Sequence, residues 1–353
     1  MSQYKFEIWD DSGNLLADLT GRAHDRAFTV SRNLPEQISF SLGLNEIEKF
    51  ARDTNVPIRT LINAGVNEIR IKKGTDYILG GKMDVPEVTI NGDQRNLSVR
   101  ASGFLNLLDD RYAGENTIRT FSSTDAGTIA KTLVDETQVE TNGNFGIQTD
   151  VAWIEPTVNR DMAYERRRVK DAIIELASLS NGFDFEFTYD KKFKVYQSIG
   201  QDRTDLVFNY PGNIRNLRLP IDSSRLANRI IARGAGQGGS QYTSTVEDTV
   251  SQGTYKLRTA IVDLPTETQS ANLTAKANEV IRIYALPLEI PSITLDGKLA
   301  PRVGLDFWIG DSIKLSIKEV GILETLTAVW RVEEITVKID DNDTETISLK
   351  LSK

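Results

Sequence analysis

The chain has 353 residues and a formal net charge of −8, with 39% hydrophobic and 26% charged residues. These are the proportions of an ordinary globular protein of two or three domains, and the acidic balance disfavours a surface that wraps nucleic acid. The chain contains no cysteine and one histidine, His24. Disulfides, thiolate sites and multi-histidine metal sites are therefore excluded within it, and Ser–His–Asp catalysis would have to use His24.

Residues 1–108 are predicted to form a first small β-barrel. Apolar and polar residues alternate from Tyr4 to Ile8, which predicts an amphipathic strand and not a signal peptide. Asn91-Gly92 indicates a tight hairpin, because these two residues accept the positive φ angles of its turn. No apolar run in the chain approaches the roughly 20 residues that span a bilayer, so no membrane segment is expected.

Residues 109–205 differ in kind and are predicted to form an α+β domain. Ser122–Asp125 is a capping signal for a helix whose apolar residues then recur at helical spacing. A second helix carries its apolar face from Val169 to Ala177 and is ended by Asn181-Gly182. Phe183–Gln197 is predicted to be a hairpin, because aromatic and polar residues alternate on both sides of a turn.

The last third returns to β-structure. Residues 206–235 and 285–353 are predicted to form a second barrel, and residues 236–284 an insertion with one helix. The apolar face of that helix comprises Leu273, Ala277, Val280, Ile281 and Tyr284. The expected fold class is thus a β-rich, multidomain α+β protein, with two related small barrels flanking an α+β domain.

A glycine-rich loop lies between the second barrel and the insertion. Gly234, Gly236 and Gly239 satisfy the G-x-G-x-x-G spacing that binds dinucleotides when a strand precedes it and a helix follows at once. The residues from Ser240 onward are polar and β-branched, without helical spacing, and no βαβ unit surrounds them. We therefore expect a strand that ends in a flexible loop at a domain boundary, without bound phosphate.

The two β-rich ends resemble each other. Val88–Arg100 parallels Val337–Lys350 in its strand–turn–strand pattern, and upstream Asn67–Ile71 parallels Asp311–Leu315, at offsets of about 244 to 250 residues. Any two amphipathic hairpins look alike, because alternation alone forces such patterns. Turn position and upstream strand agree together, however, so the sequence favours an internal duplication.

Two acidic groups could in principle perform chemistry. Asp340–Glu345 clusters the oxygen ligands that Ca²⁺ prefers, but it lacks the central glycine and flanking helices of a helix–loop–helix site, so a solvated hairpin turn is the better interpretation. Asp184 and Glu186 share one strand face and could form the carboxylate pair of a glycosidase. Outward-facing polar positions of a hairpin explain them better.

The remaining candidates are basic or aromatic. Arg166–Arg168 with Lys170 is the densest basic run, and we expect a solvated or subunit-pairing face there more than a phosphate contact. His24 is interpreted as a polar loop residue. The four tryptophans could anchor an interface or fill a core: Trp9, Trp153, Trp308 and Trp330. We expect no catalytic residue, no cofactor and no metal ion.

The order of five segments resembles that of the tail hub proteins of tailed bacteriophages, the baseplate-hub or tail-tip components. These segments are Phe28–Leu42 (FTVSRNLPEQISFSL), Ala101–Leu108 (ASGFLNLL), Leu176–Phe187 (LASLSNGFDFEF), Asn228–Gly239 (NRIIARGAGQGG) and Leu305–Leu315 (LDFWIGDSIKL). Each is a degenerate pattern of apolar residues and glycines, and together they punctuate the chain from about Tyr4 to Leu351.

The resemblance implies a structural role. A homotrimer with two similar domains in each subunit would form a ring of pseudo-sixfold symmetry, adapt the sixfold tail tube to a threefold tip and surround the DNA exit channel. Implied partners are a distal tail or tail-tube protein, the C-terminus of the tape measure protein, and tip fibre or spike proteins, without sequence-specific binding of nucleic acid. The implied location is the tail tip of a virion assembled in the host cytoplasm. The strands Glu68–Lys72 and Ser312–Ile317 are the candidate ring-forming walls.

Two alternatives remain open from the sequence. The first is a carbohydrate-binding or cell-wall-hydrolysing tail-tip protein that uses Asp184 or Glu186. The second is a hexameric distal tail adaptor, which differs from the hub in the number of subunits in its ring.

Overall fold

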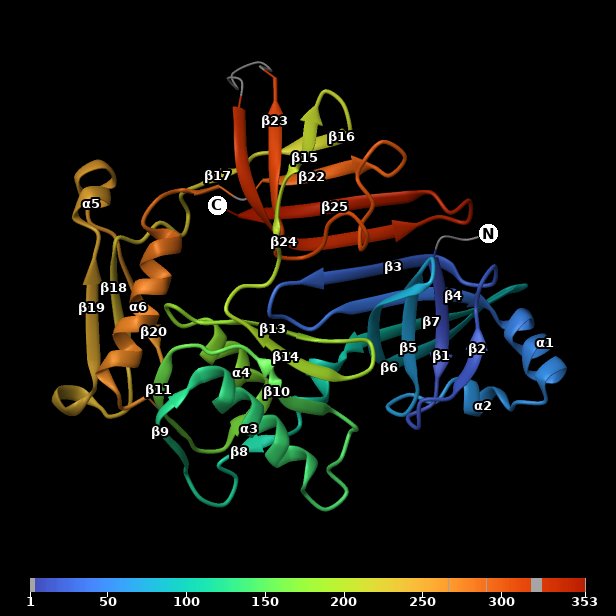
Figure 1. The fold of residues 1–353 in the computed structure, drawn as a ribbon, viewed down its shortest axis with the longest axis horizontal. Helices are drawn as coiled ribbons and strands as arrows, with labels where there is room; N and C mark the ends of the chain where they lie inside the picture. Colours follow the sequence, from blue (N-terminus) through green and yellow to red (C-terminus); the bar gives the residue numbers. More distant parts are fainter. Residues whose placement is uncertain (1–3, 266, 290, 319–325, 353) are drawn as a thin grey trace.

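A computed structural model describes residues 4–265, 267–289, 291–318 and 326–352. Strands dominate, and the main sheet has 13 strands. Figure 1 shows this sheet running from the blue strands to the red and yellow ones, with the green α+β elements below it and a smaller sheet with its helix at one end. The β-rich, multidomain α+β class predicted from the sequence is confirmed.

The N-terminal part of the main sheet, here called the first half, is built from β1 to β7. Its pairing order is β3-β4-β7-β6-β5-β1-β2, all antiparallel. The two short helices α1 and α2 connect β4 to β5. The strands and helices are β1 (Tyr4–Trp9), β2 (Leu15–Asp18), β3 (His24–Ser31), β4 (Gln37–Gly43), α1 (Leu44–Thr54), α2 (Ile58–Leu61), β5 (Glu68–Lys73), β6 (Asp76–Asn91) and β7 (Gln94–Gly103).

The C-terminal part of the main sheet, here called the second half, has the pairing order β16-β22-β25-β24-β23-β15. Only its last pair, β15 with β23, is parallel. The strands are β15 (Asp202–Tyr210), β16 (Ile214–Arg218), β22 (Ser292–Asp296), β23 (Ser312–Ile317), β24 (Leu326–Ile339) and β25 (Glu345–Ser352).

The two halves share one pairing scheme. Reading β3, β4, β7, β6 and β5 against β16, β22, β25, β24 and β23 gives the same neighbours in the same order. The registers coincide as well, since Val88 opposes Leu97 in the first half and Val337 opposes Ile347 in the second. Both long strands are also bulged at the equivalent point, between Met83 and Val85 in β6 and between Val332 and Glu334 in β24. A shared bulge is a specific feature, and it supports the duplication that the sequence pattern favours.

The two predicted barrels are open among the strands that the structure describes. The outer edge of β24 pairs with β3 of the first half, so the two halves continue into each other as one sheet. One core cluster accordingly contains residues of both, including Phe28, Phe208 and Trp330. Alternation in the sequence fixes which face of a strand is buried, but it does not fix which strand occupies its edge.

The predicted ring walls are also placed differently. The strands Glu68–Lys73 and Ser312–Ile317 are β5 and β23, and each has a partner on both sides within the chain. Neither strand therefore has a free edge with which to pair with another subunit.

The middle unit packs two helices against short sheets. Asp125 caps α3 as predicted, because its carboxylate accepts a hydrogen bond from the Thr128 N–H at 2.9 Å. Its apolar cluster extends from Phe104 to Val195. Its elements are η1 (Phe104–Leu108), β8 (Tyr112–Ala113), β9 (Arg119–Asp125), α3 (Ala126–Gln138), β10 (Gln148–Ile154), β11 (Asn159–Tyr164), β12 (Arg167–Arg168), α4 (Val169–Ala177), β13 (Asp184–Phe187) and β14 (Lys192–Tyr196).

The insertion is a three-stranded sheet covered by its helix. The strand Arg229–Arg233, which the sequence analysis assigned to the second barrel, pairs here with β19 and β20. The reason is its apolar face, since Ile230 and Ala232 are buried together with Leu273 and Ala277 of the helix. The elements are β17 (Ile221–Asp222), β18 (Arg229–Arg233), η2 (Gly238–Ser240), β19 (Thr243–Glu247), α5 (Thr249–Tyr255), β20 (Thr259–Asp263), α6 (Ser270–Tyr284) and β21 (Leu288–Glu289). No helix in the described ranges is both long and apolar enough to cross a membrane.

Candidate functional site: the junction of the two halves and the middle unit

The two halves of the main sheet meet along β3 and β24. Six antiparallel residue pairs join them, from Arg26 opposite Ile339 to Ser31 opposite Glu334. On one face Phe28 and Val337 are buried side by side in the register. On the other face the hydroxyls of Thr29 and Thr336 lie 3.0 Å apart. The junction thus has a dry face and a polar face, as a continuous sheet requires.

The turn between β24 and β25 is fastened to the first half. Arg26 donates to the Asp340 carbonyl oxygen at 2.7 Å and to the Asp343 carboxylate at 2.8 Å. The Nδ1 of His24 lies 2.9 Å from Asp341. His24 is therefore the first residue of β3 and contacts the acidic turn, in place of the loop position expected from the sequence.

The same turn has the geometry of a hairpin and not of a cation loop. The Asp340 carboxylate accepts hydrogen bonds from the N–H groups of Asn342 at 2.9 Å and Thr344 at 2.7 Å. Within the described ranges, no group of three or more histidine, aspartate or glutamate residues is arranged to hold a metal ion. The acidic side chains serve instead as acceptors for basic groups of the first half.

A buried lysine reinforces this fastening. Lys73 Nζ donates to the Tyr4 hydroxyl at 2.7 Å and lies 3.3 Å from Glu345 at the start of β25. Tyr4 donates to the same carboxylate at 3.1 Å. Burial lowers the pKa of Lys73, and Glu345 opposes that shift by favouring the charged form. The end of the second-half hairpin is thus held by a desolvated, hydrogen-bonded charge pair.

Asp184 connects the middle unit to both halves. One carboxylate oxygen accepts from Arg32 Nη1 at 2.7 Å, and the other accepts from Arg331 Nη2 at 2.6 Å. Asn33 Nδ2 donates to it at 3.0 Å and the Ile199 N–H at 2.9 Å. Burial alone would raise the pKa of Asp184, but the two arginines and these hydrogen bonds hold that pKa below its usual range.

The prediction that Asp184 and Glu186 face solvent is wrong for Asp184, which is 3% exposed. The turn between β3 and β4 covers this face of β13, and a strand pattern gives no information about such a cover. Glu186 is half-buried and accepts a hydrogen bond from Tyr196 at 2.7 Å. The two carboxylates have separate partners, so they do not form the matched pair that glycoside hydrolysis needs.

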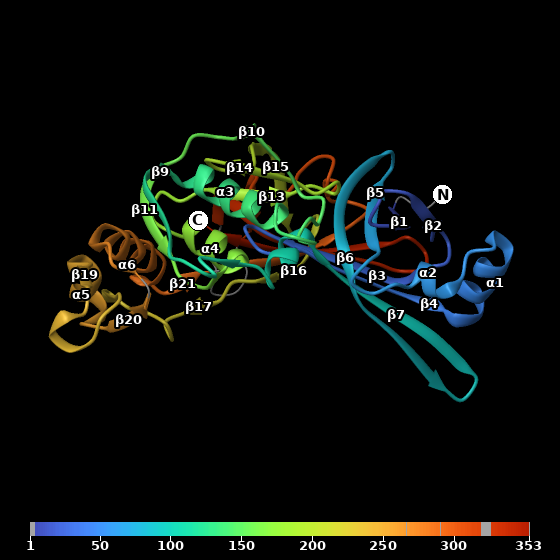
Figure 2. The same cartoon turned by 90° about the horizontal axis from the view of Figure 1, so that it is seen from below.

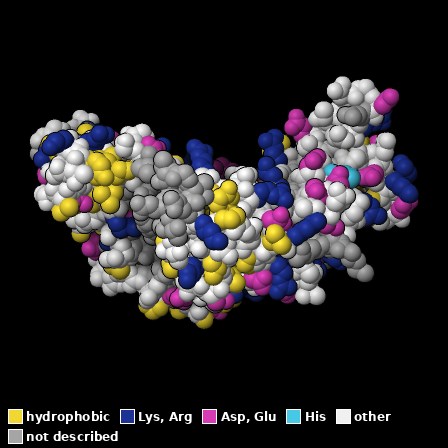
Figure 3. Space-filling view, turned by 90° about the horizontal axis from the view of Figure 1, so that it is seen from above, with side chains coloured by type: hydrophobic (Ala, Val, Ile, Leu, Met, Phe, Trp, Pro, Cys, Tyr) yellow, Lys and Arg dark blue, Asp and Glu magenta, His cyan; other side chains and the backbone are white. Residues whose placement is uncertain are grey.

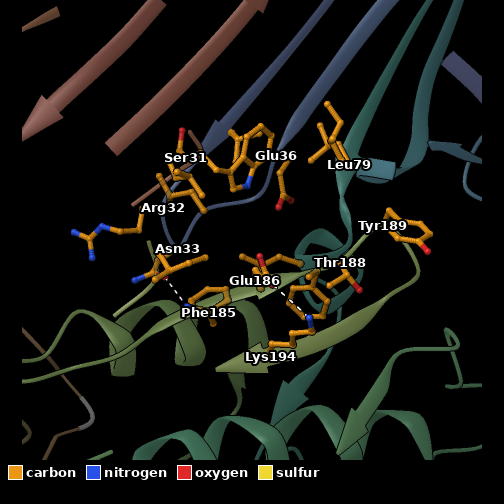
Figure 4. A pocket seen from close by; sticks show the side chains of 18 of the residues that line it. Ser31, Arg32, Asn33, Glu36, Leu79, Phe185, Glu186, Thr188, Tyr189 and Lys194 are labelled. Carbon is orange, nitrogen blue, oxygen red and sulfur yellow. Dashed lines mark hydrogen bonds and ion pairs between the residues drawn. The ribbon is translucent and has the colours of Figure 1, made fainter. Parts of the chain in front are cut away.

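Next to Asp184 a cavity of about 310 Å³ opens between the first half and the β13–β14 hairpin. Figure 4 shows Glu36 and Glu186 on its opposite walls, with Lys194 beside Glu186. Burial, with a smaller contribution from the charge of Glu186, raises the pKa of Glu36 to about 7. A Cβ atom at Gly103 would collide with the Glu36 carboxylate and with the Glu36 backbone nitrogen, which favours glycine there.

Three of the four side chains of the basic run, those of Arg167, Arg168 and Lys170, form ion pairs within the chain. Arg167 lies 3.1 Å from Glu175, and Asp109 lies 3.3 Å from Arg168 and 2.9 Å from Lys170. On the opposite side of the molecule, which Figure 3 shows from above, basic and acidic side chains are interspersed over the described surface, without a broad patch of one sign. The pairing of three of its four cations with neighbouring carboxylates disfavours a phosphate-binding role for the basic run.

The four tryptophans divide between core and partial exposure. Trp330 is 2% exposed and belongs to the shared core. Trp9, Trp153 and Trp308 are partly exposed. Arg70 lies over the ring of Trp9, at 4.4 Å from its centroid, and Trp308 lines the cavity described above.

The glycine-rich loop continues into a strand and not into a helix long enough to hold a phosphate. Residues 238–240 form one 3₁₀ turn, and β19 then returns antiparallel to β18. A Cβ atom at Gly234 would collide with the Glu267 carbonyl oxygen, which explains a glycine there without a ligand. The loop lies inside the insertion, so it does not mark the boundary that we predicted.

Sequence patterns did not identify the residues that connect the units. Arg32 and Asn33 lie in a turn, and Arg331 and Glu333 lie in β24 beside its bulge. Arg331 lies between the buried residues Trp330 and Val332, as an ordinary polar position of an alternating strand does, so no local signal distinguished it. Its partner Asp184 is 147 positions away, a separation that no local pattern reveals.

Comparison with known proteins gives a consistent answer at the level of the fold. No family model matches the sequence, and no curated protein matches it. Among solved structures, a tail protein from Neisseria meningitidis MC58 is similar with a TM-score of 0.64 and 13% identity, covering 99% of this chain and 96% of that chain. The 43 kDa tail protein of prophage MuSo2 from Shewanella oneidensis gives a TM-score of 0.63 at 11% identity, covering 99% and 98%.

Tail protein gp18 of a Listeria monocytogenes EGD-e prophage is similar too, with a TM-score of 0.59 and 11% identity over 98% of this chain and 94% of that chain. All three likenesses extend over nearly the full length of both proteins. The chain therefore has the fold of phage tail proteins, and the resemblance stated from the sequence is confirmed at that level.

Proposed function

We propose that this chain is a structural hub protein of a phage tail, which assembles as a homotrimeric ring of pseudo-sixfold symmetry. The ring adapts the sixfold tail tube to a threefold tip and surrounds the DNA exit channel. Its site is the tail tip of the virion, after assembly in the host cytoplasm. Its partners are a distal tail or tail-tube protein, the tape measure protein C-terminus, and tip fibre or spike proteins.

The observation that carries this proposal is the shared pairing scheme of the two halves. Both halves have the same strand neighbours, the same registers and a bulge at the same point. Three copies of a chain with two such halves present six similar units around one axis, which matches a sixfold tube. The likeness to three phage tail proteins over nearly the whole chain supports the same assignment.

The mass of the assembly tests the proposal. Light scattering of the purified chain is expected to give three times the chain mass of 39.4 kDa, and the complex with its tail-tube partner is expected to contain three copies of the chain. Averaged electron micrographs are expected to show a ring with six similar lobes. A hexameric mass would favour the distal tail adaptor, and a monomer in both samples would contradict both ring models.

The glycan-hydrolysing alternative loses support from the geometry. Asp184 is held by Arg32 and Arg331, and Glu186 by Tyr196, so neither is placed as a free acid or base. Assay of cell-wall and polysaccharide substrates with the intact protein and with Glu186→Gln checks this point. Turnover that disappears in the variant would restore the enzymatic alternative.

A further inference from the structure

We infer that the β6–β7 hairpin of one copy pairs with β16 of a second copy, in the way that the β24–β25 hairpin pairs with β3 within each chain. This inference rests on the proposed ring and specifies its contact between subunits. It commits to a second copy of this chain as the partner. Three features of the fold support the pairing: the shared pairing scheme, the exposure of equivalent residues, and the unpaired edges of β16 and of β6 after its bulge.

The junction within the chain supplies the template. Before its bulge, β24 pairs on its outer edge with β23, from Leu326 to Arg331. After the bulge, the same edge passes to β3, from Glu334 to Ile339. The bulge bends and twists the strand, which directs its far end away from its own half and onto the other one.

In the first half, β6 follows the same course up to that point. Its outer edge pairs with β5 from Asp76 to Lys82, and the bulge follows at Asp84. From Val85 to Asn91, only β7 pairs with it among the described strands. Figure 2 shows this part projecting from the body as a long hairpin. The segment that corresponds to the β3-paired part of β24 thus has an open edge.

The exposure of equivalent side chains indicates what covers this hairpin. By the shared register, Val88 corresponds to Val337 and Ile90 to Ile339. Val337 and Ile339 are 0% and 2% exposed, whereas Val88 and Ile90 are 53% and 63% exposed. The same apolar face is therefore core in one half and open in the other. A long edge strand with an exposed apolar face is typical of a protein–protein interface.

The receiving edge is β16, which holds the place of β3 in the second half. Arg218 opposes Ser292 as Ala27 opposes Ser39, and the chain of registers through β25 and β7 makes these positions equivalent. On the side where β3 accepts β24, β16 has no partner among the described strands. The main sheet therefore ends at β16 in an unpaired strand edge, which is the kind of partner that β6 lacks after its bulge.

Transfer of the template register gives a specific alignment. Lys338 opposes Ala27 within the chain, so Thr89 of one copy is placed opposite Arg218 of the next. Glu87 lies on the same strand face as Thr89, two residues away, which brings its carboxylate within reach of the Arg218 guanidinium. Pro86 has no N–H to donate and is best placed at the end of the pairing, so the contact centres on Val88–Ile90.

A second copy is the occupant that the structure favours, because each chain carries one hairpin with an unpaired edge (β6–β7) and one unpaired strand edge to receive it (β16). Junctions within the chain and between chains then alternate around a ring. Ring closure leaves neither edge exposed, which is how β-proteins avoid uncontrolled edge pairing. A second copy carries the same strands as the β3–β24 junction and can repeat its register, whereas an unrelated partner does not carry these strands.

Cysteine cross-linking tests the alignment directly, because the chain contains no cysteine. The double variant Thr89→Cys with Arg218→Cys is oxidised in the assembled state and resolved without reductant. Directly opposed strand residues have Cβ atoms about 4.5–5.5 Å apart, close to the span of a disulfide. We expect covalent dimers and trimers that disappear on reduction. The matched control pairs Thr89→Cys with Thr245→Cys on the insertion and is expected to give none.

A second variant tests the apolar face. Val88→Asp with Ile90→Asp is expected to weaken self-association by roughly tenfold or more, since it places charges in a desolvated contact. The control, Val139→Asp with Val250→Asp, alters two valines that are each 83% exposed and is expected to leave association unchanged.

The outcomes separate this inference from the proposed function. A trimer that forms without the 89–218 cross-link, and that survives Val88→Asp with Ile90→Asp, overturns the pairing and leaves the hub proposal intact. A cross-linked ring of another number of copies supports the pairing and overturns the trimer. A chain that neither assembles nor cross-links contradicts both.

Discussion

The β24–β25 and β6–β7 hairpins have the same register and the same bulge, yet one is core and the other projects into solvent. They differ in the strand segment that follows the bulge. The outer edge of this segment pairs with β3 in β24, whereas in β6 it pairs with no described strand. Burial of a strand is therefore decided by the edge that receives it as much as by its own alternation. Two basic side chains of the first half, Arg26 and Lys73, then form ion pairs with Asp343 and Glu345 at the end of the β24–β25 hairpin.

The largest expected effect concerns the carboxylate of Asp184, which binds Arg331 of β24 and Arg32 of the first half. Asp184→Ala should lower the free energy of unfolding by about 3–5 kcal/mol, because it leaves Arg32 and Arg331 without their shared buried carboxylate. Urea unfolding followed by circular dichroism measures the change. Asp341→Asn, at the exposed end of the same hairpin, is the control and should cost about 1 kcal/mol or less. Equal losses in the two variants would show that Asp184 contributes no more than a surface pair.

The next prediction compares equivalent residues of the two hairpins. Ile339→Ala should cost about 2–5 kcal/mol, because it removes a buried side chain and leaves a cavity. Ile90→Ala should change the stability of the monomer by only about 0.5 kcal/mol, because Ile90 is 63% exposed. Urea unfolding at concentrations too low for assembly checks both values. Similar losses would mean that the β6–β7 hairpin is already covered within one chain.

The smallest expected effect is a pH dependence at the cavity below the first half. Burial raises the pKa of Glu36 to about 7, so the folded protein binds a proton that the unfolded chain has lost. Stability from this group is therefore present below the unfolded pKa of about 4.5 and is lost as the pH rises through 7. Glu36→Gln should remove a slope on the order of 1 kcal/mol per pH unit between pH 4.5 and 7. Unfolding midpoints at several pH values measure it, and an unchanged slope would contradict the assignment to Glu36.

Local patterns predicted a large part of the fold. The helical spacing of apolar residues after Asp125 and from Leu273 onward located α3 and α6. Alternation located the hairpins, and two similar hairpins at a constant offset indicated the duplication that the shared registers now support. Each of these features depends on residues within one element or on two neighbouring ones, which is the range over which periodicity is informative.

The junction was beyond that range. Asp184 was predicted to face solvent because its strand alternates, but Arg32 and Arg331 lie 152 and 147 positions away from it. The strand Arg229–Arg233 was assigned to the wrong sheet for a similar reason, since its partners β19 and β20 follow it and not the second half. Pairing between distant segments is decided by complementary edges and charges, and a single sequence does not display them.

The sequence by itself determined the chemistry that this chain lacks, the β-rich class and the repeated hairpin, because composition and alternation are properties of residues and their near neighbours. Only the tertiary structure decided that the two halves share one sheet, that Asp184 holds three segments together, and that one of two equivalent hairpins stays open. Those features depend on which edge meets which, and edge pairing is a long-range choice made by the folded chain as a whole.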